Sequence, residues 1–285
     1  MKNHLLSGIQ VAVLLLFCST ISSVAQGNLT PPGPPAPTMK TLSQIEPRTP
    51  ISALPTNITA SGSYYVTTNL TGLASNNGIT VSTNDVTIDL NGCTLTGVSS
   101  ALAAISMSGT HSNLVVKNGA IKNWPGNGID SSAGSQNSFM NVKVLACQIG
   151  INAGNYDSIQ SCSVNGSLLF GCSLLNNCVI KDSNISNNGA HGVVASAQDE
   201  IVDCFIASNG VTGIFLNSTN CRVDGNYLLA NGNAGLQITS GNTGNIVVRN
   251  TASANPTNYI TQPSNDFGPI GTAASSTSPW ANISN

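Results

Sequence analysis

Charged side chains are scarce in this sequence of 285 residues. Only 9 residues are Lys or Arg and 11 are Asp or Glu, which together make 7% of the chain, against about 25% in an average soluble protein. The formal net charge is −2 and no basic run occurs, so binding to a nucleic-acid backbone is excluded. Aromatic residues are also few, at 5%, but 40% of the residues are hydrophobic. This content is enough for a sizeable core and excludes a disordered polar chain.

No hydrophobic run reaches the roughly 20 residues that a membrane span requires. Residues 1–25 instead combine Lys2, an apolar stretch from Val11 to Phe17 and a small residue, Ala25, at their end. This pattern is typical of a signal peptide. We therefore expect an exported protein, which is secreted, periplasmic or on the cell surface, with no membrane span after signal removal.

Proline is concentrated in one part of the chain, because eight of the 13 prolines lie within residues 28–55. Proline fixes the backbone angle φ and lacks an N–H donor, so this part is expected to be extended. We predict a linker at residues 26–51, an N-terminal cap at 52–77, a repeat region at 78–263 and a C-terminal cap at 264–285.

Small residues that tolerate turns are abundant, with 28 Gly and 36 Asn. A Gly followed by an aliphatic residue or Cys recurs at spacings of 22, 21, 21, 21 and 22, at Gly128, Gly150, Gly171, Gly192, Gly213 and Gly235. An asparagine recurs together with this glycine. It lies three residues after each of four hydrophobic pairs, at Asn188, Asn209, Asn231 and Asn255. Agreement between two markers indicates a true repeat of roughly 22 residues.

Coils of this length with short strands stack into a parallel solenoid, each coil about 4.8 Å above the last. Inward aliphatic side chains then form the core. An asparagine at a turn can donate to and accept from the asparagines above and below it, so the four repeated asparagines are predicted to form an amide ladder. Asn-Gly pairs such as Asn188-Gly189 are attributed to turns, since both residues tolerate a left-handed backbone.

Three segments carry a family resemblance: VTIDLNG at 86–92, VVKNG at 115–119 and CRVDGNY at 221–227. Over residues 40–282 the chain resembles the secreted bacterial right-handed parallel β-helix proteins of the pectin-lyase-like superfamily. With the repeat, the resemblance implies an all-β, single-domain β-helix of about eight or nine coils. The motifs of two well-known enzyme groups are missing. Polygalacturonases place paired aspartates before a His-Gly pair, whereas His191 precedes Asp199 here, and no pectate lyase signature occurs.

Two carboxylates are predicted to lie one above the other. Alignment on the hydrophobic pairs places Asp182 and Asp203 in one column, which continues as Gly225 and Arg249. A stacked pair of carboxylates suits a proton-transfer site or a calcium ion. The alternative is a pair of solvated turn residues, which the neighbouring Lys181 favours. Apart from that calcium ion, no metal or cofactor is predicted.

Phe205 and Tyr227 share another column, which alternation of side chains places on the outside. Exposed aromatic rings on a flat sheet can stack on the apolar faces of sugars; the alternative is a small cluster covered by a loop. His191 lacks a second His or Cys at ligand spacing and is interpreted as a turn residue.

Seven cysteines remain after signal removal. The alignment places Cys178 and Cys221 in one column and Cys162 and Cys204 in another, each pair two coils apart. The separation is near 9 to 10 Å, beyond the roughly 7 Å that a disulfide spans. We therefore predict buried free thiols.

Three functions stay open at this point. The first is an exported module that binds or displays a polysaccharide or other cell-envelope polymer, as a monomer and without catalysis. The second is a carbohydrate-active lyase, epimerase or hydrolase that uses Asp182 and Asp203. The third is a structural or adhesive spacer. The low charge favours the first, because acid–base chemistry on uronic polymers needs several ionisable groups in one groove.

Overall fold

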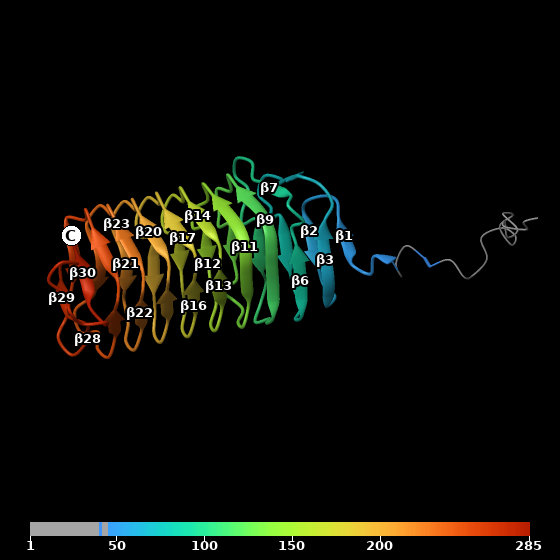
Figure 1. Cartoon of the computed structure of the whole chain (residues 1–285). Coiled ribbons are helices and arrows are strands. Elements are labelled where there is room, and N and C mark those ends of the chain that lie inside the picture. The colour runs from blue at the N-terminus through green and yellow to red at the C-terminus, as the bar shows by residue number, and fades with distance from the viewer. Residues whose placement is uncertain (1–39, 42–44) are drawn as a thin grey trace, which may run out of the picture. The chain divides into compact units, whose positions relative to one another are not determined.

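The computed structural model describes residues 40–41 and 45–285, and its compact unit is Arg48–Asn285. The predicted signal peptide and much of the predicted linker lie outside the described residues. Within the compact unit, short strands follow one another in a single winding path and stack side by side (Figure 1).

Sheet B has ten parallel strands, one from each coil. They are β2 (Thr56–Ile58), β5 (Ile79–Val81), β8 (Ile105–Met107), β10 (Ile129–Asp130), β12 (Ile151–Asn152), β15 (Cys172–Ser173), β18 (Val193–Ala195), β21 (Thr212–Leu216), β24 (Ala234–Ile238) and β27 (Thr257–Ile260).

The other 20 strands form sheet A, which bends into two rows. Row A1 contains β1 (Thr49–Ile51), β3 (Gly62–Val66), β6 (Val86–Asp89), the first parts of β9 (Leu114–Lys122) and β11 (Ser138–Leu145), β13 (Ser158–Gln160), β16 (Val179–Lys181), β19 (Glu200–Val202), β22 (Arg222–Asp224), β25 (Ile246–Val248) and β28 (Asp266–Phe267). Row A2 contains β4 (Leu70–Thr71), β7 (Thr94–Thr96), the second parts of β9 and β11, β14 (Ser163–Asn165), β17 (Asn184–Ser186), β20 (Phe205–Ala207), β23 (Tyr227–Leu229), β26 (Thr251–Ser253), β29 (Ile270–Gly271) and β30 (Asn282–Ser284).

The parallel β-helix predicted from the repeat is confirmed, and so is its register. Ile180 pairs with Ile201, and Ile201 with Val223, as the alignment placed them. Ile201 and Val223 point inward and are fully buried, whereas Glu200 and Arg222, the residues before them, are partly exposed. There are ten coils in place of the predicted eight or nine, because β2 in the N-terminal stretch already begins the stack.

Side-chain ladders bond successive coils at all three turns. After row A2, Asn188 Nδ2 donates to Asn209 Oδ1 at 2.8 Å, and Asn209 Nδ2 donates to Asn231 Oδ1 at 3.0 Å. Asn231 donates to Asn255 in the same way. A second ladder joins Asn226, Asn250 and Asn282 between rows A1 and A2, and a third joins Asn245 and Asn265 between sheet B and row A1. These amides satisfy buried polar groups that the turns would otherwise leave unpaired.

The left-handed backbone inferred for the Asn-Gly turns is present at Asn91-Gly92, where both φ angles are positive, but the glycines that follow the ladder asparagines have a different role. The positive φ angles lie one residue before the ladder asparagines, at Asn187, Ser208 and Ala230. Gly189 has no positive φ; a Cβ there would instead collide with the carbonyl oxygen of Leu168 in the preceding coil. Glycine is required at this position by the close approach of two coils. The explanation by left-handed backbone was wrong for Gly189.

All seven cysteines of the described chain are free. Ser183 lies between Cys162 and Cys204, since the backbone N–H of Cys162 donates to the Ser183 hydroxyl. Asp199 lies between the other aligned pair, Cys178 and Cys221, because the strands that follow these three residues are paired in register. Six of the seven cysteines are buried as predicted, whereas Cys93 is only half-buried. Burial raises the pKa of the Cys204 thiol to about 12, so the buried cysteines act as small neutral core residues.

No helix in the described part of the chain is long and apolar enough to cross a membrane.

Replacing Asn209 with Leu tests the ladder. Leucine leaves both the backbone N–H and the Nδ2 group of Asn188 without their acceptor, and it removes one of the two donors that Asn231 Oδ1 receives from residue 209. We therefore expect a loss of about 1–3 kcal/mol in the free energy of unfolding. Urea denaturation measures it. Asn184→Leu is the control, because Asn184 is exposed on β17. An equal effect of both changes would contradict the importance of the ladder.

Candidate functional site

The two carboxylates singled out from the sequence occupy equivalent turn positions on successive coils. Asp182 and Asp203 each have a φ of 52° between rows A1 and A2, and Gly225 and Arg249 continue the column with φ of 70° and 58°. Both aspartates are exposed. A Cβ at Gly225 would meet the Asp203 carboxylate, which therefore lies over the next coil. The structure thus brings the two residues together at the surface.

An ion cluster beside this column was missed from the sequence. Asp224 is 2% exposed and accepts hydrogen bonds from Arg222 at 2.6 Å and from Arg249 Nε and NH2 at 2.6 Å each. These bonds, above all those from Arg249, hold the pKa of Asp224 below its usual range despite partial desolvation. Glu200 lies 3.8 Å from Arg222. The two guanidinium groups are thus already paired with carboxylates of the protein.

Phe205 and Tyr227 form an exposed aromatic pair on row A2. They are register partners on β20 and β23, and their ring centroids are 5.6 Å apart with planes inclined by 32°. Their exposed fractions are 37% and 38%, so no described loop covers them. Asn184 and Thr251 flank the pair in the same column. The aromatic pair is therefore an open platform whose neighbours within its own column are uncharged.

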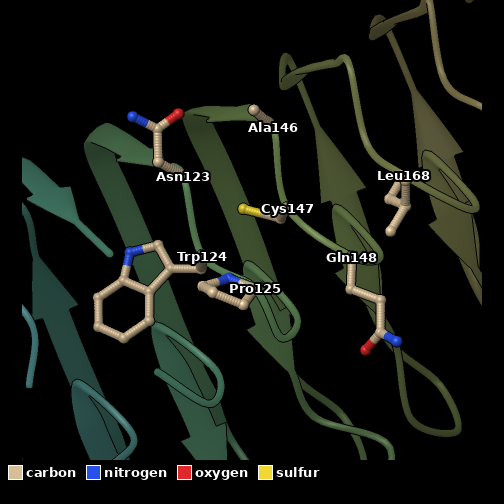
Figure 2. A pocket seen from close by; sticks show the side chains of 7 residues that line it. All are labelled: Asn123, Trp124, Pro125, Ala146, Cys147, Gln148 and Leu168. Carbon is tan, nitrogen blue, oxygen red and sulfur yellow. The ribbon is translucent and has the colours of Figure 1, made fainter. Parts of the chain in front are cut away.

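A shallow pocket lies where row A2 turns into sheet B, a region that we call the A2–B corner. Its volume is about 260 Å³. Figure 2 shows the residues that line it, which are Asn123, Trp124, Pro125, Ala146, Cys147, Gln148 and Leu168. The Trp124 indole is buried and donates to the Leu95 carbonyl at 3.2 Å. Burial raises the pKa of the Cys147 thiol to about 11, so the lining is neutral.

A stack of three rings continues along the same corner. His191 lies between Phe170 and Phe215, with ring centroids 5.7 Å and 4.5 Å away. Leu168, which lines the pocket, is two residues from Phe170 and 72% exposed. His191 does lie in the turn before β18, as expected. The repeat gave no signal for the stack, because Phe215 occupies a different repeat position from the other two rings.

The surroundings of the His191 ring favour its uncharged form. Its Nδ1 atom is buried and has no hydrogen-bond partner, and burial lowers its pKa. The ten strands of sheet B contain no Lys or Arg and one charged residue, Asp130. The residues that line the pocket and form the ring stack at the A2–B corner are therefore uncharged, and the strands of the adjoining sheet B carry one carboxylate, whereas the lysines and arginines of the strands lie on sheet A.

Two buried carboxyl groups with raised pKa values belong to the turn ladder between sheet B and row A1. Burial raises the pKa of Asp199 to about 7. Its Oδ1 and Oδ2 accept the N–H groups of Cys178 and Ser196, both at 2.8 Å. Asp157 accepts from Ser131, Asn137 and Gly154 in a similar way. Because these carboxyls are enclosed and fully bonded to the protein, they are structural.

Among residues 40–41 and 45–285, no three His, Cys, Asp or Glu side chains are grouped closely enough to hold a metal ion.

The geometry agrees with a known family. The model of the right-handed β-helix region matches residues 127–269, just over half of the 285 residues. The chain belongs to the right-handed β-helix family. No curated protein matches this β-helix in sequence.

Solved structures resemble this β-helix in fold. The A-module of a mannuronan C-5 epimerase from Azotobacter vinelandii has a TM-score of 0.54 and 13% identity, over 83% of this chain and 90% of that one. A mutant of a periplasmic alginate epimerase has a TM-score of 0.52 and 13% identity, over 80% and 75%. At such identity the likeness establishes the fold alone.

Replacing Asp199 with Asn tests the structural role of this carboxyl. Since its folded pKa is raised above its ordinary value of 3.8, its contribution to stability is complete below about pH 4 and is lost as the pH rises through about 7. Asn245 occupies the same column, so an amide fits there. We expect the unfolding free energy of the variant, relative to wild type, to increase by on the order of 2 kcal/mol between about pH 4.5 and pH 8.

Urea denaturation at the two pH values measures this difference. Asp182→Asn, which changes an exposed carboxylate, is the matched control. A difference for Asp199→Asn that is the same at both pH values would contradict the assignment.

Proposed function

We propose that this protein is a polysaccharide-binding β-helix whose sugar contacts lie along the A2–B corner. The observation that carries the proposal is the stack of Phe170, His191 and Phe215. Aromatic rings combine a large apolar face with low conformational freedom, and sugar rings present apolar faces that suit them. The pocket beside the stack adds the amides of Asn123 and Gln148 as hydrogen-bonding groups, as ligand sites require.

The arrangement suits a linear polymer. The coils of the solenoid stack along its axis (Figure 1), about 4.8 Å apart. The residues of the pocket and of the ring stack come from successive coils, so their contacts follow this axis. An extended sugar chain would contact several of them at once. The two structural neighbours described above are named for action on mannuronan and on alginate, which supports a polysaccharide as the ligand class. The neutral corner favours a neutral polymer.

Catalysis is the second candidate. The observation that favours it is the stacking of Asp182 over Asp203 in one turn column. An enzyme of this kind would release reducing or unsaturated sugar ends from a polymer, and Asp182→Asn with Asp203→Asn would abolish the release while binding persists. If no polymer binds and none is cleaved, the spacer function is what remains.

Affinity electrophoresis tests the binding proposal. Gels would contain hydroxyethyl cellulose, which is neutral, or polygalacturonate, which is anionic. We expect retardation in the neutral gel and a loss of affinity of about tenfold or more for Phe170→Ala with Phe215→Ala, since a lost ring contact is worth on the order of 1–2 kcal/mol. Val194→Ala is the control, because Val194 pairs with Phe215 in register and faces outward.

Two results would reject the proposal. One is wild-type protein that migrates unretarded in both gels. The other is retardation that is the same in the double variant and in wild type.

A further inference from the structure

The aromatic pair on row A2 and the ring stack on the A2–B corner lie on two different faces of the solenoid. Phe205 is adjacent to Ile206 on β20, and Phe215 is adjacent to Ile214 on β21. Both isoleucines are fully buried in the common core. Because side chains alternate along a strand, each phenylalanine points away from the core on its own face. The two faces are separated by the turn at residues 208–211.

Each aromatic array runs along the solenoid axis. The members of each array come from successive coils. Phe205 pairs with Tyr227 in register. The carbonyls of Phe170 and His191 occupy equivalent positions, and each accepts a glycine N–H of the preceding coil. A linear polymer that follows one array is parallel to the other and does not reach it without folding back. Two arrays of this kind therefore suit two separate chains.

The surroundings of the aromatic pair are suited to a sugar polymer. The strand positions of row A2 contain no carboxylate, and their charged residues are Lys122 and Lys143. Lys143 lies in the column that passes through Ser163 and Asn184 to Phe205. The column thus offers a cation, a hydroxyl and an amide before it reaches the two rings. These polar groups can hydrogen-bond to sugar hydroxyls, and the rings beside them can contact the apolar faces of the sugars.

We propose that the Phe205–Tyr227 platform is a second polysaccharide-binding surface, so that one molecule bridges two polymer chains. The inference rests on the proposed function, because it takes the A2–B corner as the first surface. Bridging adds a function that a single surface does not have: it converts a solution of separate chains into a network. When a polymer is bound at one of two sites on a rigid solenoid, the other site is held close to that polymer, which raises the effective concentration of this second site.

The test measures binding and cross-linking separately. Affinity electrophoresis gives binding, and the viscosity of dilute hydroxyethyl cellulose, polygalacturonate and their mixture gives cross-linking. We expect wild-type protein to raise the viscosity of at least one of the three solutions. Phe205→Ala with Tyr227→Ala should abolish that rise and still be retarded in the neutral gel. Ser253→Ala, which alters another outward residue of row A2, should behave as wild type.

The outcomes separate this inference from the proposed function. Wild-type protein that binds polymer but raises viscosity in none of the solutions overturns bridging and leaves the corner site standing. Cross-linking by the Phe205→Ala, Tyr227→Ala variant at the wild-type level also overturns it, because self-association through one site would then be the cause. A protein that binds no polymer removes both proposals together.

Discussion

Hydrogen bonding from coil to coil is the constraint on which the rest of this structure depends. Strands of two or three residues, such as β12 and β18, make too few backbone bonds to fix a register alone. The ladder amides add bonds at the turns, where each one is buried and pairs with the coil above and the coil below. Asn209, for example, bonds both Asn188 and Asn231. Register is set where the chain bends as well as where it is extended.

The same constraint explains why ionisable groups are found inside the solenoid. A turn position that faces the interior must supply an acceptor for the N–H of the neighbouring coil. Asparagine fills most such positions, but a carboxyl oxygen of Asp199 or a hydroxyl of Ser183 also fits. A raised pKa at Asp199 is therefore a consequence of architecture. The raised pKa of Asp199 is accordingly no indication of a catalytic role.

Stacking of identical coils also determines the form of the outer surface. The side chain at each outward position lies about 4.8 Å from the side chain at the equivalent position of the next coil. Chemically similar side chains then form lines parallel to the axis, such as Phe205 with Tyr227 and Phe170 with His191. Lines of contacts match linear polymers better than compact ligands. The neutral character of sheet B and the lysines of row A2 make the two lines different.

The sequence by itself determined the repeat, the register and one of the three ladders, because a side chain's position within a coil depends only on its place in the repeat. It also paired Asp182 with Asp203 and Phe205 with Tyr227. Only the tertiary structure decided which groups meet across repeat positions. Arg249 reaches Asp224 from 25 residues away, and Phe215 reaches His191 from a different position in its coil. Such contacts depend on the directions of long side chains over the turn surface, and a periodic pattern contains no information about those directions.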